Sequence, residues 1–215
     1  KQDNTPVTCA DLAANELIVN KLSELTPDIP ILSEESAEVP YEQRRHWETY
    51  WLVDPLDGTR AFIERTGEFS VNIALVHQNY PVIGVIYSPV KQCCFYACRG
   101  CGAFYLNRDE QSNPIQVRSD CPKQITVAGT RSSRSVALMS YLENLEQEFE
   151  GYDVKFMASS LKSCMVAEGE ADLYVRLGPT SEWDTAAAQC IVEEAGGMIT
   201  DTNMNALRYN TRETL

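Results

Sequence analysis

The chain has 215 residues, enough to bury a sizeable hydrophobic core as one large domain or as two tightly joined lobes. Asp and Glu number 31 against 18 Lys and Arg, a formal charge of −13 that excludes a general nucleic-acid binder, whose affinity rests on a basic surface. No apolar run approaches the roughly 20 residues that a membrane-spanning helix needs, and no signal peptide is visible.

The first predicted elements each carry acids at one end. An amphipathic segment runs from Asp11 to Leu25, and an acid at the start of a helix is often only a cap or a dipole partner. Ile29 to Leu32 predicts a short strand, which is followed directly by the carboxylates of Glu34 and Glu35.

The next apolar strand runs straight into two carboxylates, Asp54 and Asp57. Pro55 fixes its own φ and favours an extended Asp54, so a tight turn can aim both acids at one point. The Leu56 carbonyl falls between them as a third oxygen. Magnesium prefers a few carboxylates and other oxygen ligands, so the turn is a candidate magnesium site.

Gly58 and Thr59 follow these acids and open a short predicted helix over residues 60 to 65. Gly58 lets the backbone approach an anion closely, and the N–H groups at such a helix start can cradle a phosphate. The alternative is an Asx turn that only caps the helix, since Asp, Pro, Gly and Thr are all common turn residues.

The middle of the chain predicts an antiparallel meander with strands over 69–76, 82–87 and 93–97. The polar segment from Asp109 to Asn113 is predicted to be a connection. Cys98 and Cys101 have C-x-x-C form, but they bracket a predicted hairpin turn and lack a second pair or suitably spaced histidines, so we interpret them as incidental thiols. Free thiols fit a reducing cytoplasm, with peripheral association at the inner membrane as an alternative.

The second part alternates predicted strands over 125–128, 154–158, 171–175 and 198–200 with helices over 136–149, 160–168 and 183–195. Such alternation indicates an α/β layer, and with the first part it predicts a layered αβαβα plan. We expect an acidic metal-binding lobe over residues 1–118 and an α/β lobe over residues 119–215. Asp184 falls in a first helical turn, where a role as a helix cap is the simplest interpretation.

Taken together, the acid-bearing motifs resemble those of the inositol monophosphatase superfamily of lithium-sensitive, magnesium-dependent phosphatases, and within it most of all the bacterial 3'(2'),5'-bisphosphate nucleotidases. The resemblance extends over nearly the whole chain, although the family's N-terminal helix and last strand are not recognised. Because the chain begins at Lys1, a preceding leader stays open. The motifs, in chain order, are Val7-Thr8-Cys9-Ala10-Asp11, Ser33-Glu34-Glu35, Trp51 to Thr59, and Trp183-Asp184-Thr185-Ala186-Ala187.

The resemblance implies roles for these residues. Thr59, hydrogen-bonded to Asp11, would orient and help deprotonate a metal-bound water that attacks phosphorus in line, without a covalent phosphoenzyme. Gly58 and Thr59 would contact the phosphate, and Glu35 would support the site. Two or three Mg²⁺ ions would be held by Glu34, Asp54, the Leu56 carbonyl, Asp57 and Asp184.

The same resemblance makes Ser159, Lys162 and Arg176 substrate-binding candidates. Arg176 stands where inositol monophosphatases typically have Glu, and its planar fork favours a second phosphate group over sugar hydroxyls. The alternatives are a helix cap for Ser159 and a solvated surface for the two cations. Ser133 stands where relatives often have His, which departs from the nucleotidase pattern.

These expectations combine into one function. The chain is predicted to hydrolyse the 3'-phosphate of adenosine 3',5'-bisphosphate to AMP, and to act likewise on 3'-phosphoadenylyl sulfate. Its partner would be this small nucleotide, whose negative charge the bound Mg²⁺ would offset. An inositol or sugar phosphate phosphatase is the rival enzyme, and a non-catalytic metal or nucleotide sensor is the rival of another class.

Overall fold

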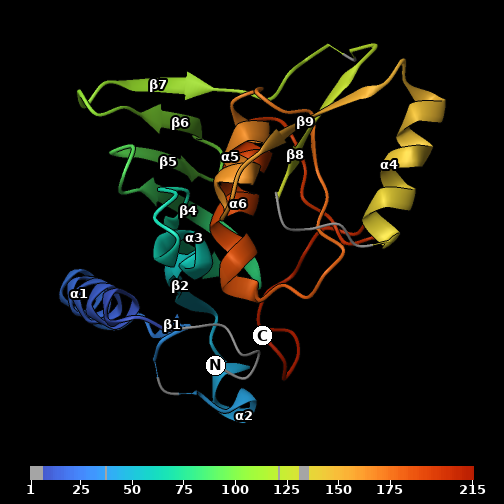
Figure 1. Ribbon diagram of the computed structural model, residues 1–215. Coiled ribbons are helices and arrows are strands. Elements are labelled where there is room, and N and C mark those ends of the chain that lie inside the picture. Colours follow the sequence, from blue (N-terminus) through green and yellow to red (C-terminus); the bar gives the residue numbers. More distant parts are fainter. Residues whose placement is uncertain (1–6, 37, 121, 131–135) are drawn as a thin grey trace.

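A computed structural model describes residues 7–36, 38–120, 122–130 and 136–215. Its main sheet has seven strands, whose order along the sheet is their order in the chain (Figure 1). The first two strands are parallel, and all the other neighbours are antiparallel. The strands are β1 (Ile31–Ser33), β2 (Thr49–Asp57), β3 (Ser70–His77), β4 (Tyr80–Ser88), β5 (Cys93–Cys98), β6 (Gly102–Leu106) and β7 (Ser112–Ile115).

The predicted meander is confirmed as β3, β4 and β5, and burial alternates strictly along β3 and β5. In β3 every second residue is buried, beginning with Ser70 and Asn72, so one face of the strand packs inward. The predicted connection over Asp109 to Asn113 is wrong in part. Ser112 and Asn113 pair with β6, because the chain turns back tightly after Asn107, whose side chain accepts hydrogen bonds from two backbone N–H groups of the turn.

A second sheet has three parallel strands in the order β10 (Leu173–Tyr174), β8 (Ile125–Gly129) and β9 (Tyr152–Phe156). The expected strand over 171–175 shrinks to two residues, because the Asp172 side chain accepts the Thr126 N–H in place of a ladder bond. The expected strand over 198–200 is also wrong. The Asp201 carboxylate organises a turn, and Thr200 forms only an isolated bridge with Ala206.

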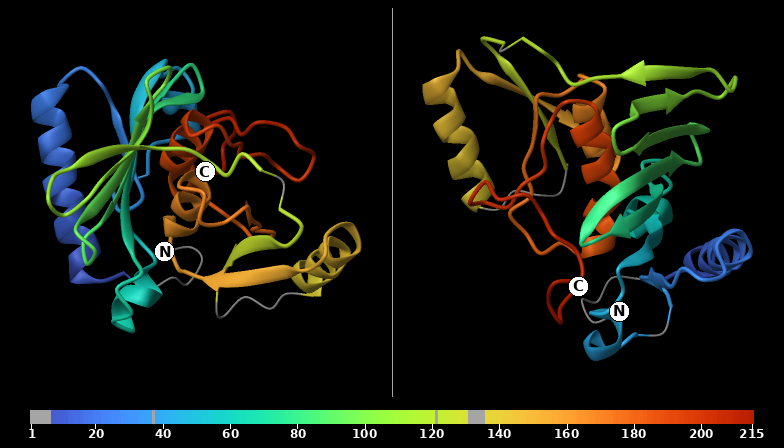
Figure 2. Two further views of the ribbon diagram at one scale, coloured as in Figure 1. Left: turned by 90° about the horizontal axis from the view of Figure 1, so that it is seen from above. Right: turned by 180° about the vertical axis from the view of Figure 1, so that it is seen from behind.

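The helices separate and cover the two sheets in five layers (Figure 2, left). Helix α1 (Cys9–Leu25) lies on one side of the main sheet, α5 (Leu161–Ala167) and α6 (Glu182–Glu194) lie on the other, and the second sheet and α4 (Val136–Glu148) follow. The expected αβαβα plan is confirmed. The short helices α2 (Tyr41–Arg44) and α3 (Thr59–Ile63) flank β2.

Helix α6 approaches the main sheet very closely. A Cβ atom placed on Gly84 would lie 2.4 Å from the Ala187 carbonyl oxygen, so only glycine allows this contact. The small side chains of Ala186, Ala187 and Ala188 are all buried in the central core. This packing sets the position of the α6 N-terminus, and with it Asp184, against the end of β2.

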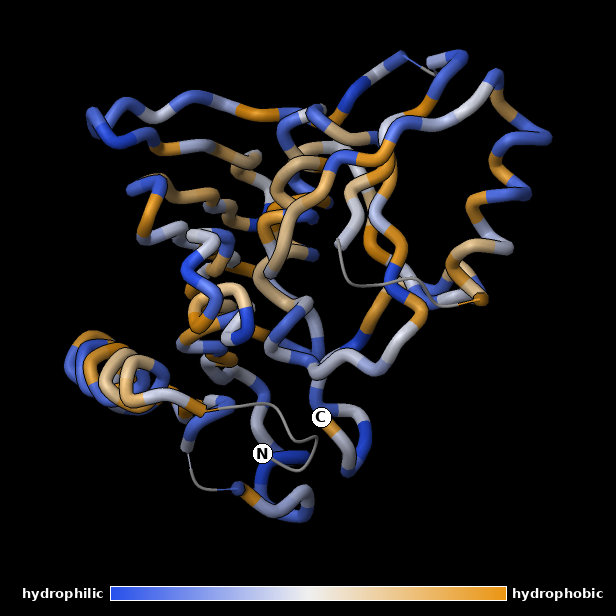
Figure 3. The backbone as a smooth tube through the Cα atoms, viewed as in Figure 1, coloured by the Kyte–Doolittle hydropathy of each residue, from blue (hydrophilic) through white to orange (hydrophobic). Residues whose placement is uncertain are grey.

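Hydropathy follows these layers. Helix α1 carries both hydrophobic and hydrophilic residues along its length, as expected of a helix with one face on the sheet (Figure 3). No helix in the described ranges is long and apolar enough to cross a membrane.

The proposed boundary between the two lobes, between residues 118 and 119, falls between β7 and β8, where the chain leaves one sheet for the other. The division into two lobes stays a prediction.

Candidate active site

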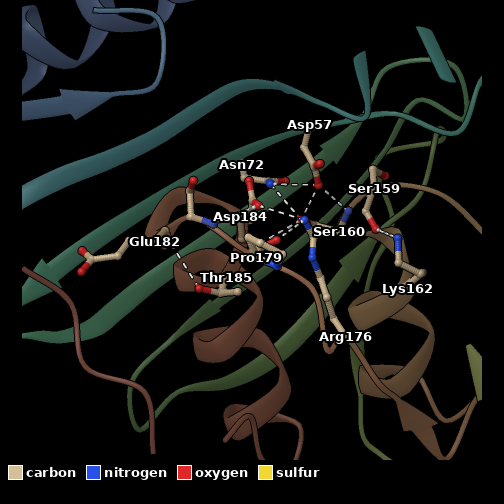
Figure 4. A network of polar contacts seen from close by, with 11 residues as sticks. Asp57, Asn72, Ser159, Ser160, Lys162, Arg176, Pro179, Glu182, Asp184 and Thr185 are labelled. Carbon is tan, nitrogen blue, oxygen red and sulfur yellow. Dashed lines mark hydrogen bonds and ion pairs between the residues drawn. The ribbon is translucent and has the colours of Figure 1, made fainter. Parts of the chain in front are cut away.

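Three carboxylates converge from distant parts of the chain. Asp54 and Asp57 lie at the end of β2, where the pairing with β3 is irregular, and Asp184 lies in the first turn of α6. One carboxylate oxygen from each lies within 4.8 Å of the other two. Figure 4 shows Asp57 and Asp184 facing the same space. All the donors are oxygens, which suits a hard divalent cation.

Electrostatics supports the same interpretation. Burial raises the pKa of Asp54 well above its ordinary value, and the negative charges of Asp57 and Glu34 raise it further. Burial, then the charge of Asp57, raises the pKa of Asp184 to about 7. The negative charges of these acids repel one another at close range, and this repulsion destabilises the metal-free site. A bound cation would remove that repulsion.

Glu34 and Leu56 complete the predicted ligand set around Asp54. The Glu34 N–H donates to the Val53 carbonyl at 3.1 Å, and its side chain approaches Asp54 closely enough for a hydrogen bond. The Leu56 N–H donates to Asp54 Oδ1 at 3.0 Å, which ties the turn to its own first acid. Glu35 is half-buried beside Glu34. Their roles as ligands and support stay predictions.

Asp11 lies in the same neighbourhood and is also a helix cap. Its Oδ2 accepts hydrogen bonds from the backbone N–H and the hydroxyl of Thr8, at 2.8 and 2.5 Å, in a capping box that starts α1. Its Oδ1 accepts from the Thr59 hydroxyl at 3.4 Å. Both Asp11 and Thr59 are buried. The interpretation of Asp11 as a helix cap is therefore confirmed, and its second carboxylate oxygen accepts the hydrogen bond from Thr59.

Asp184 follows the same pattern. It is the third residue of α6, and its Oδ2 accepts the N–H of the N-cap residue Ser181 at 3.3 Å. The interpretation as a helix cap is therefore confirmed for Asp184 too, and it explains the role of one carboxylate oxygen, Oδ2. Capping orients the carboxylate at a helix start, and tertiary packing brings that helix start to Asp54 and Asp57.

Gly58 joins the acidic turn to the predicted substrate residues. Its φ of +89° lies in the left-handed region, and an added Cβ would lie 3.2 Å from the Ser159 side chain. Any other residue here would be strained and would push Ser159 away. The five-residue helix α3 follows, with Thr59 as its first residue.

Two of the three predicted substrate residues are buried beside the acids. Lys162 is only 4% exposed, so the alternative of a solvated surface is wrong for this residue. Its Nζ donates to the Ser159 carbonyl at 2.7 Å and lies 5.1 Å from the centre of the Tyr174 ring. Burial lowers the pKa of Lys162 to about 8, although the nearby charge of Asp57 opposes this.

Arg176 lies at the open edge of this group. Its side chain is exposed, as the surface alternative predicts, yet Nη2 lies 3.7 Å from Asp184 Oδ2. Figure 4 places Arg176 and Lys162 around the carboxylates of Asp57 and Asp184. Ser133, which departs from the family pattern, falls within residues 131–135 and lies outside the described residues.

Sequence reasoning missed two residues that touch the acids, Asn72 and Ser160. Asn72 alternates in the sequence with the apolar Val71 and Ile73, so the pattern alone assigns it to the polar face of the strand, whereas the structure places it on the buried face of β3. Ser160 is only one residue from Ser159, but nothing in the pattern distinguishes it from an ordinary helix start. Both residues bond to Asp57.

The cysteines within the described residues take no part in this cluster. Cys98 and Cys101 are exposed and free, on either side of a turn in which the Cys101 N–H donates to the Cys98 carbonyl at 2.8 Å. Cys164 and Cys190 are buried on α5 and α6.

The model of the inositol monophosphatase family matches residues 1–215. The chain belongs to the inositol monophosphatase family. It is 46% identical over 219 residues to the 3'(2'),5'-bisphosphate nucleotidase CysQ of Salmonella typhimurium, covering 99% of this chain and 83% of that protein. It is 44% identical over 217 residues to the same-named protein of Haemophilus influenzae, covering 100% of this chain and 79% of that protein.

Comparison with solved structures supports the same family membership. The fold is similar to that of CysQ from Bacteroides thetaiotaomicron, a bacterial member of the family, with a TM-score of 0.89, 40% identity, and coverage of 99% of this chain and 82% of that one. The family is metal-dependent, and the cluster of Asp54, Asp57 and Asp184 can hold a metal. Membership makes the chain an enzyme of the phosphatase class. Nothing in the comparisons supports peripheral association with the inner membrane.

Proposed function

We propose that this chain is a 3'(2'),5'-bisphosphate nucleotidase, which hydrolyses the 3'-phosphate of adenosine 3',5'-bisphosphate to AMP and phosphate. We extend the proposal to 3'-phosphoadenylyl sulfate, which carries the same 3'-phosphate. The observation that carries it is the pair of cations, Lys162 and Arg176, beside the acidic cluster. The names of the relatives point to the same substrate. A cytoplasmic location is part of the proposal.

Magnesium fits the donor set, and we propose it as the cofactor with two or three ions. Asp54, Asp57 and Asp184 would hold it, together with Glu34 and the Leu56 carbonyl. When bound, Mg²⁺ would lower the pKa of a water and screen the phosphate oxygens. The formal charge of −13 is compatible with an anionic substrate on these terms, since cations reverse the local field where the acids gather.

Thr59 and Asp11 would orient the attacking water. A hydroxyl has one proton, and Thr59 Oγ1 lies 3.4 Å from both Asp11 Oδ1 and the Leu56 carbonyl oxygen. If the Leu56 carbonyl serves a cation, the Thr59 proton points to Asp11. The lone pairs of Thr59 then remain to accept a hydrogen bond from the water, which holds it and favours loss of its proton.

The cations would select the substrate. A substrate with a second phosphate supplies an anion that lies away from the reacting group, and an Arg fork binds phosphate with two parallel hydrogen bonds. Inositol hydroxyls would be served better by a carboxylate, which only accepts hydrogen bonds. Lys162, fixed by the Ser159 carbonyl and the Tyr174 ring, would add a point charge beside it.

The decisive experiment compares turnover of adenosine 3',5'-bisphosphate and of inositol 1-phosphate by the same preparation in the same Mg²⁺ buffer. We expect the nucleotide to have the higher kcat/KM by about 10- to 100-fold, as one charge-assisted phosphate contact allows. A preference for inositol phosphate would overturn the substrate assignment. Binding of AMP without turnover of either ester would favour the rival sensor function.

A further inference from the structure

The carboxylate of Asp57 is held through one of its two oxygens. Oδ2 accepts the Ser160 N–H at 2.5 Å, the Ser160 hydroxyl at 2.6 Å, and one N–H of the Asn72 amide at 3.4 Å (Figure 4). Among the described residues, every hydrogen bond to the Asp57 side chain ends on Oδ2. Oδ1 therefore has no hydrogen-bond donor among the described residues, and one oxygen of Asp57 lies within 4.8 Å of oxygens of Asp54 and Asp184.

Asn72 fixes the direction of the Ser160 hydroxyl. Its Nδ2 donates to Ser160 Oγ at 2.9 Å, while its Oδ1 accepts from the Ser70 hydroxyl at 3.1 Å. Because Ser160 Oγ accepts one hydrogen bond from Asn72, its single proton points toward Asp57, the closer and charged acceptor. Asn72 is 1% exposed and Ser160 is 5% exposed, so water competes little with these bonds.

The same hydroxyl reaches the other side of the site. Ser160 Oγ lies 3.1 Å from the backbone carbonyl oxygen of Asp184. One side chain thus contacts both the β2 acid and the first turn of α6. It also stands in the chain directly beside Ser159, whose carbonyl fixes Lys162.

We propose that Ser160 and Asn72 are positioning residues that bind Asp57 Oδ2 and leave Oδ1 for the cation. This inference rests on the proposed metal-dependent phosphatase function and deepens it. Both residues act through Asp57, so their loss weakens the cation site first.

The experiment measures Mg²⁺ binding by calorimetry, without substrate, in Ser160→Ala. This change removes the hydroxyl and keeps the backbone N–H bond to Asp57. We expect Mg²⁺ affinity to fall about ten-fold, the size of one hydrogen bond to a charged group. In turnover assays the Mg²⁺ concentration for half-maximal rate should rise by the same factor. At saturating Mg²⁺, the KM for the nucleotide should stay within about two-fold of wild type, because the substitution leaves the enzyme's own contacts with the substrate unchanged.

A matched control is Ser88→Ala. Ser88 is a fully buried serine whose hydroxyl has no hydrogen-bond partner among the described residues, so the same chemical change should leave Mg²⁺ affinity unaltered. Asn72→Ala is the second variant. Because Asn72 and Ser160 are in direct contact, the double variant should lose less affinity than the product of the two single losses.

The possible results distinguish failure of this inference from failure of the proposed nucleotidase function. A folded Ser160→Ala protein that binds Mg²⁺ with wild-type affinity would overturn the inference. A double variant whose loss of Mg²⁺ affinity equals the product of the two single losses would overturn it as well. If Asn72→Ala does not fold, the Ser160 and Ser88 pair still decides. Preference of the wild type for inositol phosphate would overturn the nucleotidase assignment and leave this inference standing, since calorimetry with Mg²⁺ uses no substrate.

Discussion

Thr59 Oγ1 lies 3.4 Å from Asp11 Oδ1, although 48 positions separate the two residues in the chain. Asp11 caps α1 with its other oxygen, and Thr59 starts α3, so the contact joins two helix starts. A residue that serves as an ordinary cap is in this way also available to orient a hydroxyl in the site.

Removing that hydroxyl should affect rate more than binding. We expect Thr59→Ala to lower kcat by about 10²- to 10³-fold with little change in KM, since proton handling by a positioned group contributes in that range. Steady-state kinetics at saturating Mg²⁺ measures this. Thr59→Ser keeps the hydroxyl and should retain most activity, and equal loss in both variants would point to packing instead.

Asp54→Asn should abolish turnover while the fold is kept. Without metal at pH 8, this variant should be more stable than wild type, because one buried carboxylate that repels its neighbours is gone. We expect a Tm increase of about 2 to 6 °C, for roughly 1 to 2 kcal/mol, by calorimetry. Added Mg²⁺ should then stabilise wild type but not the variant. The exposed Asp153→Asn is the control and should change neither quantity.

Stability should depend on pH and metal together. The folded-state pKa of Asp184 is about 7, above its ordinary value, so the metal-free folded state binds more protons than the unfolded state between about pH 4 and 7. This contribution to stability is present at low pH and is lost as pH rises through 7. The metal-free Tm should therefore be lower at pH 8 than at pH 5.5. Mg²⁺ needs the deprotonated acids, so it should raise Tm far more at pH 8, and equal increments at both pH values would contradict this.

Arg176→Ala should change substrate preference. Losing a charge-assisted phosphate contact should raise the KM for adenosine 3',5'-bisphosphate by about 10- to 100-fold. The KM for inositol 1-phosphate, which lacks the second phosphate, should change much less. The control is Arg45→Ala, because Arg45 forms a surface ion pair with Glu42 at 2.9 Å, away from the acids. Equal effects on both esters would argue against a specificity role.

The exposed thiols should be dispensable. The turn between Cys98 and Cys101 is bound at the far end of α6, where the N–H groups of Gly100 and Gly102 each donate to Glu194 at 2.8 Å. That end lies about 15 Å along the helix from Asp184. A Cys98→Ser/Cys101→Ser double variant should keep kcat/KM within about two-fold, and a large loss would show that these thiols are not incidental.

Prediction from sequence worked best where neighbours in the chain decide the outcome. The alternation in β3, the turn after Asp54 and the acids at the starts of α1 and α6 all depend on interactions within a few residues. It failed at Asp172 and Asp201, where a side chain accepted a hydrogen bond that a strand would otherwise have taken. Such competition depends on which backbone N–H lies nearby, and local pattern does not record it.

The amino-acid sequence by itself determined that carboxylates stand at the ends of several elements, that Asp54 and Asp57 share one turn, and that the chain resembles metal-dependent phosphatases. Only the tertiary structure decided that Asp184 meets that turn, because the meeting depends on the close contact of α6 with Gly84. It also decided that Lys162 is buried and that Ser160 and Asn72 hold Asp57. These contacts join segments far apart in the chain, and their existence depends on how helices pack on sheets rather than on any local spacing.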